Sequence, residues 1–186
     1  MRISSTKSRF LAVLSSASLV AAVIIATPSH AAAVGPICDK KVPVQTCQGT
    51  TSDGAPYVMM VPANFNGTVA LYSHGYRYAI DLPAGMLPSV PKGYKVTNTP
   101  EPVPGGDPTL AGYFLGNGMA IMGSGFARQG WNLDSAVTTN VELVGAFKTA
   151  FPTTKHVLAW GGSLGGIITQ TLAEKYPTLV LSLIHI

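Results

Sequence analysis

The stretch that most constrains the fold of this 186-residue chain is Gly-Gly-Ser-Leu-Gly-Gly at positions 161–166. The apolar run 156–160 before it is typical of a strand, and 167–176 after it has the apolar spacing of a helix. A G-x-S-x-G pattern between a strand and a helix indicates the sharp turn that presents a nucleophilic serine. The sequence therefore predicts that Ser163 is a catalytic nucleophile. The alternative is a glycine-rich strand-to-helix turn with a passive serine.

The glycines beside Ser163 fit the requirements of that chemistry. A serine hydroxyl becomes a good nucleophile when it is held exposed, at a helix N-terminus, beside a general base. Because the turn that does this is tight and strained, neighbouring side chains must be absent. We expect Gly161 and Gly165 to meet this need.

A second motif, His74-Gly75-Tyr76, directly follows a strand-like run at residues 68–73. Acyl transfer to a serine needs donors aimed at the developing oxyanion. One donor is expected to be the backbone N–H of Leu164, the residue after the nucleophile. The other is expected from the loop after an earlier strand, here the backbone N–H of Tyr76. Alone, His74 would be interpreted as a packing or hydrogen-bonding residue at a strand end.

Strand-like and helix-like segments alternate along the chain and favour the α/β class, with a mostly parallel sheet and flanking helices. Asn66-Gly67 predicts a hairpin turn. Asp107 is expected as the N-cap of a helix that starts at Pro108. The proline- and glycine-rich residues 83–106 predict a surface loop that could overhang a site. The expected strands are 57–61, 68–73, 119–122 and 156–160, and two further helices are expected at 133–150 and 167–176.

The N-terminus has the three-part pattern of a secretory signal peptide. Residues 1–31 contain three basic residues and no acid, then an apolar run, then A-x-A-like sites with cleavage expected after Ala31 or Ala33. Removing them lowers the formal charge from +4 to +1, so the basic balance does not indicate nucleic acid or anionic lipid as a partner. We expect a secreted protein without stable membrane association; the alternative is an uncleaved anchor.

Cys38 and Cys47 lie close together near the expected mature N-terminus, within residues 36–54, which look like an extended leader. In an exported protein such a pair predicts a disulfide that closes a small loop. Two free thiols are the alternative. A metal site would need further ligands that are not nearby.

These motifs together make residues 57–180 resemble the α/β-hydrolase superfamily. The resemblance rests on residues 74–76, on 123–126 with 130–131, and on 159–166. This combination of motifs is similar to that of secreted bacterial esterases or peptidase-like hydrolases. It implies a Ser-His-acid triad, an acyl-enzyme mechanism, no metal or organic cofactor, and a small ester or peptide-like substrate. Tyr76, Phe126 and Trp131 are candidates to line the near side of the site, or else core residues.

The chain departs from that pattern after Ser163. The triad order in this fold is serine, then an acid, then histidine. Only Glu174, expected on a solvated helix face, and His185 follow the serine. Residues 181–186 also match the translation of a transposase sequencing adapter. We therefore expect 32–180 to be the N-terminal part of a hydrolase domain and 181–186 a non-native tail; a genuine strand is the alternative.

Three other functions stay open on the sequence. A peptidase or amidase would use the same turn at Ser163. A non-catalytic secreted binding module would need no triad. A nucleotide-binding protein would use the glycines at 123–125, although the third glycine of that fingerprint would fall at Arg128.

Overall fold

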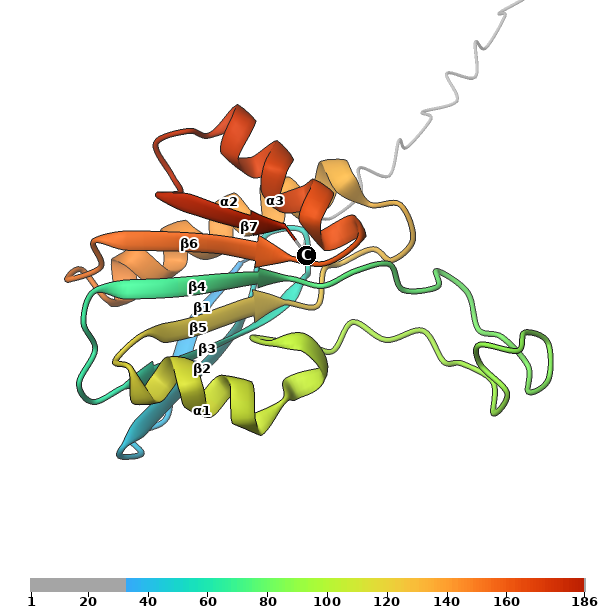
Figure 1. Cartoon of the computed structure of the whole chain (residues 1–186), viewed down its shortest axis with the longest axis horizontal. Coiled ribbons are helices and arrows are strands. Elements are labelled where there is room, and N and C mark those ends of the chain that lie inside the picture. Colours follow the sequence, from blue (N-terminus) through green and yellow to red (C-terminus); the bar gives the residue numbers. More distant parts are fainter. Residues whose placement is uncertain (1–32, 186) are drawn as a thin grey trace, which may run out of the picture.

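The structure, a computed structural model, describes residues 33–185. The predicted signal peptide therefore lies outside the described residues. One sheet forms the centre of the molecule, with helices on both of its faces (Figure 1). The strands are β1 (Val34–Cys38), β2 (Val44–Thr50), β3 (Pro56–Pro62), β4 (Thr68–Ser73), β5 (Ala120–Ser124), β6 (His156–Gly161) and β7 (Ser182–His185). The helices are α1 (Pro108–Gly116), α2 (Leu133–Ala150) and α3 (Leu164–Lys175), with a 3₁₀ turn at Pro104–Gly106.

The sheet has the strand order β1-β2-β3-β5-β4-β6-β7. Strands β4, β5, β6 and β7 are mutually parallel, and β3 pairs antiparallel with β5. Since β2 is antiparallel to β3 and β1 to β2, only β1 and β3 run against the other strands. The predicted α/β class with a mostly parallel sheet is confirmed.

Each face of the sheet has its own apolar core. Helices α2 and α3 pack against each other and cover one face, where the larger core contains Leu71, Met122 and Ile168. Helix α1 covers the other face, where Leu110 and Phe114 pack against a core that includes Trp160. The central strands are buried on both sides, which explains why their sequences are continuous apolar runs.

The predicted elements agree with the structure to within a few residues. Strand β4 and helix α2 have the expected bounds, and α3 begins three residues before the expected start. The expected N-cap is confirmed because Asp107 Oδ1 accepts the backbone N–H groups of Thr109 at 2.8 Å and Leu110 at 3.2 Å. These helix bounds follow from local capping and periodicity, which a sequence displays directly.

Two local predictions were wrong. Asn66-Gly67 does not close a hairpin, because β5 lies between β3 and β4 in the sheet. Residues 36–54 are not an extended leader: β1 and β2 form an antiparallel pair at the sheet edge. In both cases the pairing depends on distant strands rather than on the local sequence.

Beyond β4 the chain leaves the sheet and extends past the carboxyl ends of the strands before it returns to α1 (Figure 1). This excursion includes the predicted loop 83–106. At the C-terminal end, Ser182–His185 form strand β7, which pairs with β6. A strand at this place was the alternative to the predicted non-native tail. None of the helices in the described part of the chain is long and apolar enough to cross a membrane.

Candidate functional site

Ser163 occupies the turn between β6 and α3 in a conformation that is rare for residues with side chains. Its φ is 54° and its ψ is −126°, and it is the residue directly before the first turn of α3. Its side chain is exposed. Within residues 33–185, Phe126 is the only other non-glycine residue with positive φ. The turn therefore stores strain at an exposed serine, as a nucleophile elbow does.

The glycines on either side of Ser163 are required because the end of β4 lies against them. A Cβ atom on Gly161 would lie 2.6 Å from the carbonyl oxygen of Ser73. A Cβ on Gly165 would overlap that same oxygen. The turn can approach the end of β4 only without these side chains, which is the role expected of Gly161 and Gly165.

The predicted oxyanion loop lies beside the serine. A Cβ atom placed on Gly75 would be 3.7 Å from Ser163 Cβ and 3.4 Å from the carbonyl oxygen of Gly162. Leu164 is the first residue of α3, so its N–H has no acceptor within the helix. In the described part of the chain the Tyr76 N–H donates to no other backbone group. The structure thus brings together the two motifs that the sequence singled out.

The buried side chain of His74 packs beneath this loop and hydrogen-bonds to it. Its side chain is 4% exposed and its ring lies 4.5 Å, centroid to centroid, from the ring of Phe126. Nδ1 lies 2.7 Å from the carbonyl oxygen of Gly75, which can only accept, so Nδ1 carries the proton in the neutral ring. Burial, and secondarily the charge of Arg77, lower the pKa of His74 from 6.5, against smaller opposing effects of nearby carbonyls and Glu101. The imidazole is therefore held neutral.

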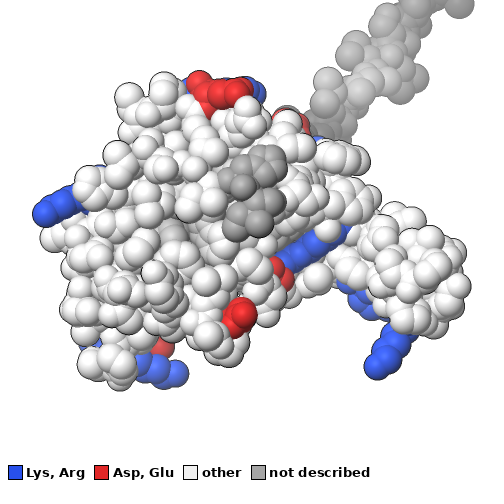
Figure 2. Space-filling model, viewed as in Figure 1, with Lys and Arg blue, Asp and Glu red and all other residues white. Residues whose placement is uncertain are grey.

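Arg77 connects the loop after β4 to its surroundings through one ion pair, one side-chain hydrogen bond and one backbone hydrogen bond. The Arg77 guanidinium lies 2.6 Å from a Glu101 carboxylate oxygen and also donates to the carbonyl of Thr99 at 2.9 Å. The carbonyl of Arg77 accepts the N–H of Gly130 at 2.9 Å. These contacts join the Tyr76 segment to the loops before α1 and α2. Figure 2 shows the charged groups of this face as small, separate patches.

A further residue at the site, Asn140, was missed by the sequence analysis. It is fully buried on α2, and its Nδ2 donates to Ser73 Oγ at 2.9 Å. Ser73 is the residue whose carbonyl oxygen packs on the elbow glycines. The available signal was a polar residue on the apolar side of the predicted helix, next to Val141 and three positions after Val137. A buried polar side chain is rare without a hydrogen-bond partner, so this position indicated a buried hydrogen bond.

The other predicted residues are dispersed. Cys38 and Cys47 form a disulfide between β1 and β2, at the sheet edge opposite to β6 and β7. Glu174 is exposed and accepts a hydrogen bond from Gln170 at 3.0 Å, as expected for a solvated helix face. Phe126 is 1% exposed and belongs to the core, whereas Tyr76 and Trp131 are exposed. No group of three metal-ligating side chains occurs among the residues described.

Comparison with known proteins finds similarity at the level of structure. No protein-family model and no curated protein matches the chain. The PEG-bound complex of a cold-adapted esterase from an Arctic intertidal metagenomic library aligns with 14% sequence identity and a TM-score of 0.50 over 80% of this chain. The native structure of a cold-adapted esterase from an Arctic intertidal metagenomic library aligns with 15% identity and a TM-score of 0.48 over 80% of this chain. The chain spans 62% and 61% of those two proteins, and the first alignment shows that it shares the fold of an esterase.

Proposed function

We propose that this chain is part of a serine hydrolase of carboxylic esters, with Ser163 as the nucleophile. The observation that carries the proposal is the positive φ of an exposed serine at the start of α3, beside the Gly75 loop. Holding a non-glycine residue in such a conformation costs about 1–3 kcal/mol. A passive turn would take a glycine at this position at no such cost.

In the proposed mechanism, Ser163 Oγ attacks the ester carbonyl carbon as a base takes the hydroxyl proton. The carbonyl oxygen becomes an oxyanion and accepts hydrogen bonds from the backbone N–H groups of Leu164 and Tyr76. The N-terminal end of α3 adds a favourable dipole at the same place. As the intermediate collapses, the base gives its proton to the departing alkoxide, which leaves as the alcohol, and an acyl-enzyme remains. Water then hydrolyses the acyl-enzyme, which releases the acid and restores the Ser163 hydroxyl. No step needs a metal or an organic cofactor.

The general base is the component that the described residues do not supply. No histidine or carboxylate side chain between residues 33 and 184 hydrogen-bonds to the Ser163 hydroxyl, and His74 is committed to the Gly75 carbonyl. We therefore propose that the triad histidine and acid come from another part of the hydrolase, and that this chain alone turns over slowly or not at all. An oxyanion hole without its triad still supplies on the order of 10³-fold catalysis.

The same geometry would serve amide substrates, so a peptidase or amidase is the nearest variant of the proposal. A binding module without turnover is the other alternative.

We also propose that the N-terminal segment directs export, which would place the hydrolase outside the cell, where the Cys38–Cys47 disulfide is stable. A small-molecule ester is the proposed substrate.

A fluorophosphonate probe tests the proposal because it reacts with serines of enhanced nucleophilicity. In the complete hydrolase, which also contains the proposed triad histidine and acid, we expect mass spectrometry to find the phosphonyl group on Ser163 and the Ser163→Ala variant to lose it. Ser52→Ala is the matched control, since Ser52 is an exposed serine whose hydroxyl donates to Glu142. Equal labelling of Ser52 and Ser163, or none at all, would contradict the proposal. If Ser163 is labelled, release of p-nitrophenol from its acetate against p-nitroaniline from its acetamide separates esterase from amidase.

A further inference from the structure

Two large aromatic side chains lie exposed on the loops that contain and neighbour Gly75. Trp131 is 76% exposed and Tyr76 is 45% exposed. Their ring centroids are 6.0 Å apart with an interplanar angle of 52°. The two residues come from different loops, so only the tertiary structure pairs them. A ligand that covers such rings gains about 25 cal/mol per Å² of apolar area removed from water.

The position of the pair relates it to the reaction centre. Tyr76 directly follows Gly75, whose α-carbon faces Ser163. The backbone of Tyr76 is thus part of the proposed oxyanion loop, while its side chain lies at the surface against Trp131. The pair therefore begins one residue from the contact between Gly75 and Ser163.

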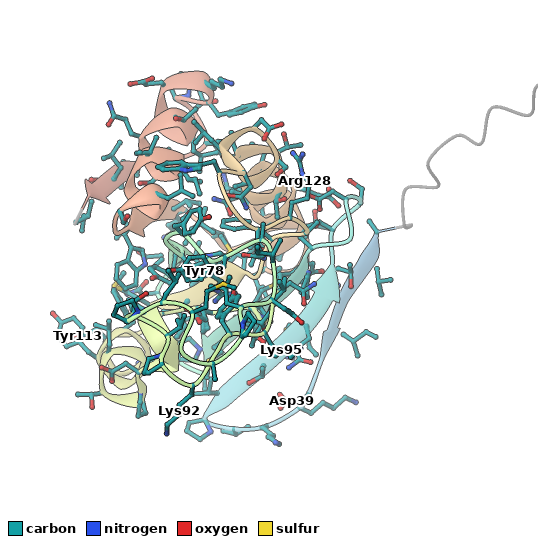
Figure 3. All side chains as sticks on the ribbon, turned by 90° about the vertical axis from the view of Figure 1, so that its right-hand side faces the viewer. Asp39, Tyr78, Lys92, Lys95, Tyr113 and Arg128 are labelled. Carbon is teal, nitrogen blue, oxygen red and sulfur yellow. A yellow bond between two sulfur atoms is a disulfide. The ribbon has the colours of Figure 1, made fainter. Side chains whose placement is uncertain are left out.

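The pair is held in place by contacts beneath it. The hydrogen bond from Gly130 N–H to Arg77 O, at 2.9 Å, joins the residues next to Trp131 and Tyr76. Tyr78 packs edge-on against Tyr76, with centroids 5.7 Å apart, and also against Tyr94 at 5.4 Å. In the view onto the carboxyl ends of the strands, Tyr78 lies near the middle of the molecule, whereas Tyr113 lies at its periphery on α1 (Figure 3).

The arginines next to the pair each form an ion pair with a carboxylate. Arg77 pairs with Glu101, and Arg128 lies 3.1 Å from Asp134. The surface therefore offers aromatic faces and edges without a net charge. Aromatic rings prefer offset-stacked or edge-to-face partners at centroid separations of roughly 4.5–7 Å, which a third ring could reach from either member of the pair.

We propose that Tyr76 and Trp131 form a subsite for an aromatic ring of the ester substrate. This inference rests on the proposed function, because it assigns the ring to the substrate of Ser163. The subsite binds the ring by stacking and leaves the carbonyl group to the serine.

Acrylamide quenching of tryptophan fluorescence tests the subsite without requiring turnover. The chain has two tryptophans, and Trp160 is 7% exposed, so quenching by acrylamide reports on Trp131. We expect methyl phenylacetate to protect Trp131 from acrylamide. Methyl cyclohexylacetate, of similar size but with a saturated ring, should protect only at higher concentration. Replacing Tyr76 by Leu should weaken the protection roughly two- to tenfold, the range that aromatic pairs support.

The control is Tyr113→Leu, which removes an exposed tyrosine from α1, and it should leave the protection unchanged. Equal protection by the two esters, or unchanged protection in Tyr76→Leu with an unaltered circular dichroism spectrum, would overturn the subsite. The two proposals fail separately. Protection without fluorophosphonate labelling would support a ring-binding surface and refute the serine hydrolase. Labelling without protection would support the serine hydrolase and refute the subsite.

Discussion

The carbonyl oxygen of Ser73 and the α-carbon of Gly165 lie so close that no side chain fits between them. The first residue of this pair ends β4 and the second lies in the first turn of α3, so the contact sets how near the turn at Ser163 comes to the Gly75 loop. The position of Ser163 is therefore determined by backbone packing between two parallel strands and one helix.

Gly165→Ala is expected to destabilise the protein by about 1–3 kcal/mol, the usual range for overpacking a close contact. Urea unfolding followed by circular dichroism measures the change. Gly145→Ala is the control, because Gly145 lies inside α2 with open space around its α-carbon. That variant should gain about 0.5–1 kcal/mol from helix propensity. Similar stabilities of the two variants would show that the contact with Ser73 does not constrain the turn.

The backbone strain at Ser163 gives a second prediction. Ser163→Gly should be more stable than Ser163→Ala by about 1 kcal/mol or more, because glycine adopts positive φ without steric cost. Both variants remove the hydroxyl, so both should lose fluorophosphonate labelling. The urea midpoints of the two proteins provide the comparison. An alanine variant as stable as the glycine variant would mean that the turn carries no strain.

The sequence predicted the elements of this fold where local features determine them. The N-cap at Asp107, the bounds of α2 and the turn from β6 to α3 follow from capping, periodicity and glycine spacing. The order of the strands does not, because the insertion of β5 between β3 and β4 depends on pairings across more than fifty residues. The β1–β2 pair was missed for a related reason: the polar Val44–Thr50 segment becomes a strand through its pairing with β3.

For the candidate site, the sequence identified the residues of the two motifs but not those that hold them. The Asn140 side chain reaches Ser73 only because α2 packs against the sheet, next to β5, and the pairing of Tyr76 with Trp131 depends on the contact between Arg77 and Gly130. Both relationships join residues more than fifty positions apart. Local sequence patterns carry no information on such contacts.

The buried hydrogen bond between Asn140 and Ser73 gives a third prediction. Asn140→Ala should cost about 1–3 kcal/mol, because it leaves the Ser73 hydroxyl buried without its partner. Combining it with Ser73→Ala in a double-mutant cycle should give a coupling energy of roughly 0.5–3 kcal/mol. The stabilities of the four proteins come from urea unfolding. Additive effects would show that the two side chains do not interact.

The lowered pKa of His74 predicts how stability depends on pH. Because burial, with the charge of Arg77, lowers the pKa of the folded state below 6.5, the unfolded chain binds the proton more readily. The stabilisation from neutral His74 is complete above pH 6.5 and is lost as the pH falls below that value towards the folded pKa. We expect the wild-type urea midpoint to be lower at pH 5.5 than at pH 7.5, and His74→Gln to show a smaller decrease. The control is His156→Gln, which replaces an exposed histidine at the start of β6. An equal decrease in His74→Gln and wild type would mean that protonation of His74 does not oppose folding.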